Sequence, residues 1–97
     1  MPIEEVKVIG VDEVRTNKAV PENLLYNVYF ELSIVPNNDW VKIFEKYKIS
    51  NKKLENSWVD GRHIVVKSSV SEIDQILEEL RKEVTRINFK YSENSKK

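Results

Sequence analysis

The stretch of residues 24–35, LLYNVYFELSIV, has the most regular pattern in the sequence and decides the fold class. Apolar or aromatic side chains occupy alternate positions: Tyr26, Val28, Phe30, Leu32 and Ile34. The positions between them hold Asn27, Tyr29, Glu31 and Ser33. This period-two alternation predicts a β-strand in a sheet that has one buried and one wetter face. Pro36 follows and is expected to end the strand.

A second strand is predicted upstream, in residues 3–15, where Val6 and Val8 alternate with polar or charged neighbours. Gly10 interrupts this pattern. A lone glycine inside a strand marks either a β-bulge or a close approach by another backbone, and the sequence leaves both open. Residues 15–23 are polar and are interpreted as the connection to the stronger strand.

A short helix is predicted after the strong strand. Asn37, Asn38 and Asp39 are candidates for its N-cap. The next residues place one apolar stripe over two turns, at i, i+3, i+4 and i+7: Trp40, Ile43, Phe44 and Tyr47. The helix is expected to end near Lys48, where a polar segment begins.

A β-hairpin is predicted around Asp60-Gly61, because this dipeptide between two apolar runs is a strong short-range hairpin signal. A two-residue loop would pair Trp58 with His63, whereas a bulged three-residue loop would shift that register. The sequence leaves both loops open. In either case Gly61 is expected to have a positive φ, where a Cβ is penalised.

The strongest helix signal lies in residues 71–91. Ser71, three residues before Asp74, resembles a capping box. An apolar stripe extends over five turns: Ile73, Ile76, Leu77, Leu80, Val84, Ile87 and Tyr91. Residues 92–97 are polar and are predicted to form a frayed tail, which leaves a single domain over residues 1–91.

The element order β-β-α-β-β-α predicts an α+β protein with two layers. We expect a four-stranded, mostly antiparallel sheet with both helices on one of its faces. A circular permutation of the ferredoxin-like order β-α-β-β-α-β would give the same sequence of elements. This is an analogy of architecture, and architecture does not imply function.

Composition excludes several classes of function. The 97 residues contain no cysteine, so disulfides and thiolate metal sites are ruled out. Sixteen Lys and Arg balance sixteen Asp and Glu, which disfavours a general nucleic-acid binder. No apolar run reaches the roughly 18 residues of a membrane span, and the acidic MPIEE start is unlike a signal peptide. We therefore expect a cytoplasmic protein that does not enter a membrane.

His63 is the only histidine and the only candidate for a catalytic base. Ser57 and Asp60 lie near it in sequence and complete the residue types of a Ser-His-Asp set. A tight surface turn, however, offers neither a cleft nor an oxyanion hole, so an enzyme that uses His63 is a remote alternative. One histidine, no cysteine and two distant glycines also predict no metal site, no phosphate loop and no cofactor.

Two features point instead to binding. The segment 42–53 is basic, with Glu45 as its only acid: Lys42, Lys46, Lys48, Lys52 and Lys53. It is interpreted either as a patch for nucleic acid or an acidic protein, or as lysines that complement the dipole at the end of a helix. Tyr29 and Trp58 are the second feature, since aromatic side chains on an uncovered sheet face are typical of protein interfaces and of base-stacking platforms.

The sequence therefore predicts a small, non-enzymatic interaction module. It would bind a protein partner, or a second copy of itself as a homodimer, through the open sheet face or a sheet edge. The predicted surface comprises Tyr29, Trp58, Lys46, Lys48, Lys52, Lys53 and Arg62. The alternative is a nucleic-acid-binding domain that uses the segment 42–53.

Overall fold

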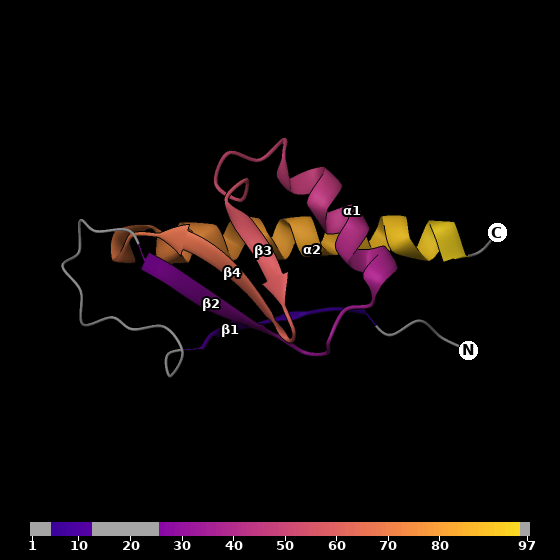
Figure 1. Cartoon of the computed structure of the whole chain (residues 1–97), viewed down its shortest axis with the longest axis horizontal. Coiled ribbons are helices and arrows are strands. Elements are labelled where there is room, and N and C mark those ends of the chain that lie inside the picture. Colours follow the sequence, from indigo (N-terminus) through magenta and orange to yellow (C-terminus); the bar gives the residue numbers. More distant parts are fainter. Residues whose placement is uncertain (1–4, 13–25, 96–97) are drawn as a thin grey trace.

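The computed structural model of the chain describes residues 5–12 and 26–95. Its elements follow the predicted order: β1 (Val8–Val11), β2 (Tyr26–Leu32), α1 (Asn38–Lys48), β3 (Ser57–Asp60), β4 (His63–Ser68), the 3-10 turn η1 (Val70–Glu72) and α2 (Ile73–Ser95). Figure 1 shows α2 running along the molecule, with the strands and α1 laid across it. At 23 residues α2 is about 35 Å long.

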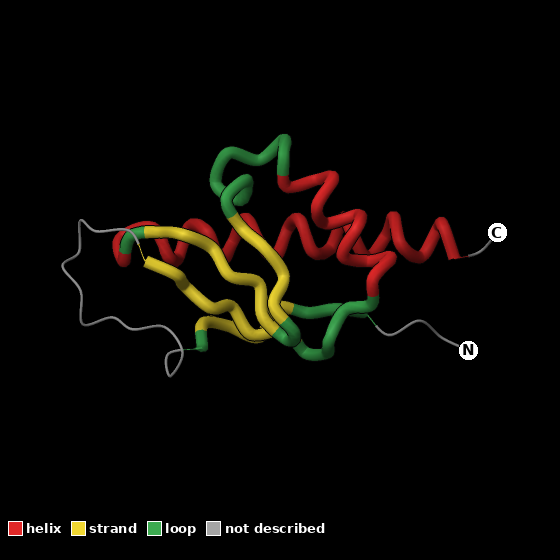
Figure 2. Tube along the Cα trace, in the orientation of Figure 1, coloured by secondary structure: helices red, strands yellow, loops and turns green. Residues whose placement is uncertain are grey.

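The four strands form one antiparallel sheet in the order β1-β2-β4-β3, which confirms the predicted α+β class (Figure 2). This is also the strand order that the permuted ferredoxin-like arrangement gives. Both helices pack on the same face, because their buried side chains join one core with alternate residues of β2 and β4. The core residues of the two strands are Val28, Phe30, Leu32, Ile64 and Val66.

The alternation predicted for the strong strand is confirmed, but β2 ends earlier than expected. Val28, Phe30 and Leu32 have no exposed surface, whereas the strand stops at Leu32 and does not reach residue 35. The reason is local. The backbone N–H of Ser33 still donates to the oxygen of Lys7 at 2.8 Å, but the N–H of Lys7 donates to the Ser33 hydroxyl at 3.0 Å, so a side chain takes the place of the return bond of the ladder.

The interruption at Gly10 is a β-bulge. Val8 pairs with Leu32 and Gly10 with Glu31, so Ile9 is the extra residue on β1. No heavy atom lies within 4 Å of the position that a Cβ would take at Gly10, so the close-approach alternative does not apply. The bulge turns the side chain of Ile9 outward, where 55% of its surface is exposed.

The hairpin loop consists of the two residues Gly61 and Arg62, but the pairing of Trp58 with His63 that was expected for a two-residue loop does not occur. Asp60 remains in β3 and pairs with His63, which places Trp58 opposite Val65. Gly61 has a φ of 60°, as expected, while no other described residue has a positive φ. Glycine alone in the first loop position is the arrangement of a type II′ turn, and this turn leaves Asp60 free to join the ladder.

Both helices begin near their predicted positions. The side chain of Asn37 accepts a hydrogen bond from the backbone N–H of Trp40 at 3.0 Å, so Asn37 is the N-cap of α1. Ser71 lies inside the turn η1 and contacts the Ser69 hydroxyl, so α2 begins only at Ile73. The helix then continues to Ser95, through four residues that were predicted to belong to a frayed tail.

Asn88 joins three elements in a way that the sequence did not indicate. Its Oδ1 accepts hydrogen bonds from the indole Nε1 of Trp40 at 2.9 Å and from the backbone N of Val6 at 3.2 Å. Its Nδ2 donates to the backbone oxygen of Val6 at 2.8 Å. One side chain of α2 thereby fixes both α1 and the segment that leads into β1.

Candidate functional site

The open face of the sheet is the one opposite the helices. Its side chains are Asn27, Tyr29 and Glu31 from β2, Trp58 and Asp60 from β3, and His63, Val65 and Lys67 from β4. The predicted orientation of Tyr29, opposite Phe30, is thus confirmed. Neither helix covers this face, so it is the side of the sheet on which a binding surface could lie.

A central row of Tyr29, Val65 and Trp58 crosses the open face. The strand registers pair Tyr29 with Val65 and Val65 with Trp58. Val65 has no exposed surface, although it does not belong to the core beneath the helices. Tyr29 is half-buried rather than fully exposed, and Trp58 leaves 40% of its surface exposed. The structure therefore brings the two aromatic residues predicted from the sequence into one apolar row.

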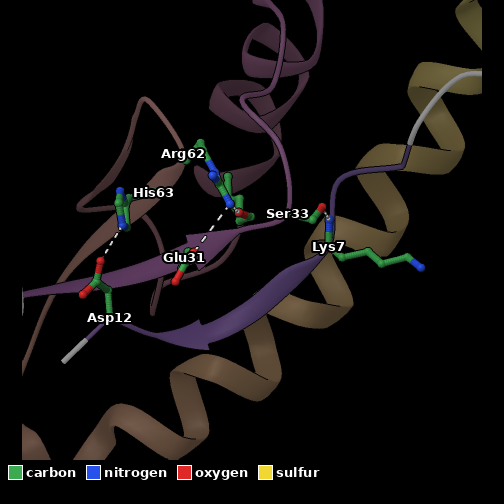
Figure 3. A network of polar contacts seen from close by, with 7 residues as sticks. Lys7, Asp12, Glu31, Ser33, Arg62 and His63 are labelled. Atoms are coloured by element: carbon green, nitrogen blue, oxygen red, sulfur yellow. Dashed lines mark hydrogen bonds and ion pairs between the residues drawn. The ribbon is translucent and has the colours of Figure 1, made fainter. Parts of the chain in front are cut away.

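A polar pair lies beside this row. The Nε2 of His63 is 2.9 Å from the Oδ2 of Asp12, which follows β1 on the far side of β2 (Figure 3). The ring of Tyr29 meets the imidazole edge-on, with 5.8 Å between centroids and 82° between planes. His63 and Asp12 are mostly buried, with 14% and 19% of their side chains exposed. The pair ties β4 to the end of β1 across the open face.

Arg62 contacts the same end of the sheet from the hairpin loop. Its guanidinium lies 3.5 Å from a carboxylate oxygen of Glu31, and its backbone oxygen accepts a hydrogen bond from the N–H of Leu32 at 2.7 Å (Figure 3). Half of the Arg62 side chain is exposed. Arg62 therefore belongs to the open face.

The Ser57-His63-Asp60 combination does not assemble. The Ser57 hydroxyl is buried and donates a hydrogen bond to the backbone oxygen of Leu54. It lies on the helix side of β3, whereas His63 lies on the open face and is oriented by Asp12. Among residues 5–12 and 26–95, no three His, Asp or Glu side chains are placed to hold a metal ion.

The described part of the chain has surface hollows beside the helices. Three of them, of about 240, 310 and 470 Å³, are lined by residues of the helices and of the segments beside them. The largest of these three is lined by Phe89, and none of the three is lined by a residue of the open face.

The basic segment 42–53 is less available than its composition suggests. Lys48 donates to the backbone oxygen of Ser57 and pairs with Glu45 at 2.8 Å, and only 16% of its side chain is exposed. Lys53 donates to the side-chain oxygen of Gln75 at 3.0 Å. Four of the five lysines are exposed to solvent: Lys42, Lys46, Lys52 and Lys53. The structure thus divides the predicted patch between internal contacts and exposed charges.

Helical side chains also occupy the sheet edges. Lys48 binds the edge oxygen of Ser57 on β3. On the other edge, Asn88 binds both backbone polar groups of Val6, and the guanidinium of Arg81 lies 3.4 Å from the oxygen of Ile9. An added strand would have to compete with these contacts for backbone groups at the edges.

Comparison of the chain with family models, with curated proteins and with solved structures gave no match. In the part of the chain that the structure describes, no helix is both long and apolar enough to cross a bilayer.

Proposed function

We propose that this protein is a non-enzymatic interaction module that binds a protein chain through the open face of its sheet. The single observation that carries the proposal is the exposure of Trp58. A tryptophan that keeps 40% of its surface exposed lies in one row with a half-buried tyrosine and a buried valine, on the face that the helices leave free. Tyr and Trp in such positions are the residues on which binding energy concentrates.

The surroundings of the central row support this proposal. Charged and polar residues flank it on both sides: Asn27, Lys67, Glu31, Asp60 and Asp12. A protein interface has the same layout, with an apolar centre inside a polar rim that keeps water away from the centre. We place binding on the face and not on the edges, because Lys48, Asn88 and Arg81 occupy edge backbone groups.

A photo-crosslinking amino acid introduced at position 58 tests the proposal. Expressed in cells of the protein's own source, the variant should form a covalent adduct with a protein after irradiation. The same amino acid at position 78, exposed on α2, is the matched control and should form no comparable adduct. A Tyr29→Glu substitution in the position-58 variant should abolish the adduct, because it would bury a charge in the interface. Equal adducts at positions 58 and 78, or none at 58, would contradict the proposal.

A further inference from the structure

The open face carries opposite charges at its two ends. Lys67 is exposed at one end of β4. At the other end of the same strand, His63 pairs with Glu31 on β2 and with Asp60 on β3. Asp60 is exposed, and 39% of the Glu31 side chain is exposed. Four residues separate the two ends along β4, which is about 13 Å.

The apolar central row lies midway between these ends. Val65 stands two residues from Lys67 and two residues from His63 on the same strand. At the acidic end Arg62 pairs with Glu31, so Asp60 carries the excess negative charge there. The face is therefore basic, apolar and acidic in sequence along the strand direction. A surface with this order is complementary to itself when one copy is reversed end to end.

Two sheets that pack face to face keep their strand directions within about 30°. A symmetric dimer of this kind has a two-fold axis in the plane between the sheets. An axis along the strands would place Lys67 of one copy at the same end as Lys67 of the other. An axis across the strands would place Lys67 near Asp60 and Glu31 of the second copy, while the two central rows meet.

We infer that the protein chain bound by the open face is a second copy of this protein, packed with its strands reversed about an axis across the strands. The inference rests on the proposed function, because it names the partner of the same surface. Charge complementarity supports a second copy as the partner, because in the dimer the Lys67 of each copy lies against the acidic end of the other copy. The chain has no net charge, so two copies do not repel each other over a distance.

A charge-swap experiment tests this partner and this orientation together. Lys67→Glu and Asp60→Lys are prepared as separate variants, and their dimerisation is measured by sedimentation equilibrium. Each variant alone places like charges together twice and should raise the dimer Kd about tenfold or more. Mixed in equal amounts, they should form a heterodimer with a Kd within about threefold of the wild type, since both contacts then join opposite charges.

Matched controls separate this effect from a change in net charge. Lys82→Glu and Glu78→Lys alter the charge of the chain by the same amounts on the exposed side of α2, and they should leave the Kd unchanged. The double variant Lys67→Glu/Asp60→Lys restores opposite charges within one chain and should dimerise like the wild type. Recovery of dimerisation in the double variant would also show that neither substitution acts by unfolding the chain.

Three outcomes would overturn the inference: a wild type that is monomeric at millimolar concentration, single variants that dimerise normally, or a mixture that stays monomeric. The proposed function fails separately. If position 58 crosslinks to a different protein and the wild type is monomeric, the open face is a binding surface and its partner is not a second copy. If the wild type dimerises and position 58 gives no adduct, both statements fail.

Discussion

The two faces of the sheet are built by alternate residues of the same strands, yet their side chains differ in their contacts and in their exposure to solvent. On the covered face, Val28, Phe30 and Leu32 pack under both helices and lose all contact with solvent. On the open face, the intervening residues form one apolar row and a set of polar pairs whose members remain partly exposed. The covered face therefore supplies most of the stability, and the open face is available for function.

Adjacent residues of β2 give the sharpest test of this difference. Phe30 has no exposed surface, so Phe30→Ala should lower the free energy of unfolding by about 3–5 kcal/mol. Tyr29 is half-buried on the other face, and Tyr29→Ala should cost about 1–2 kcal/mol. Urea denaturation of the two variants measures both values. Equal losses would mean that the open face is as firmly packed as the covered one.

The alternation that separates these faces was predictable because it is local. A period of two in residues 24–35 and an apolar stripe in residues 71–91 each report the side of an element that will be buried. The N-cap at Asn37 is likewise a short-range signal, and the structure confirms it. Aromatic residues on the wetter side of a strand, such as Tyr29, therefore pointed correctly to the open face.

The contacts of the candidate site were not predictable because they join distant parts of the chain. Asp12 meets His63 across 51 residues, and Asn88 meets Val6 across 82. Both contacts depend on the strand order, which no local pattern encodes. The sequence left the hairpin register open for a different reason. Glycine suits both a type I′ and a type II′ turn, so the sequence could not say whether Asp60 belongs to the loop or to the strand.

The second-largest effect is expected at Asn88, which anchors the covered side of the sheet. Asn88→Leu would leave the indole N–H of Trp40 and both backbone polar groups of Val6 without their partner. We expect a loss of about 2–3 kcal/mol, as for buried polar groups deprived of a hydrogen bond. Asn27→Leu on the open face is the control and should change stability by less than about 0.5 kcal/mol. Similar urea midpoints for the two variants would show that Asn88 is not an anchor.

A smaller effect is expected at the two glycines, which serve the sheet in different ways. Gly61 needs its φ of 60°, so Gly61→Val should destabilise the fold by about 1–2 kcal/mol. Gly10 has an ordinary φ and open space around it, so Gly10→Ala should be neutral within about 0.5 kcal/mol. Thermal unfolding of both variants distinguishes them. A tolerated valine at position 61 would be incompatible with the type II′ turn.

The smallest effect is expected for the polar pair that spans the open face. A double-mutant cycle with Asp12→Asn and His63→Gln should give a coupling energy of about 0.5–1 kcal/mol, because the two side chains keep some contact with water. The same cycle for Glu31 and Arg62, which are more exposed and 3.5 Å apart, should give less. A coupling above about 2 kcal/mol between Asp12 and His63 would show that this pair fixes β1 to β4 as firmly as the core does. The open face would then be a second structural layer, and the division between a face for stability and a face for binding would no longer hold.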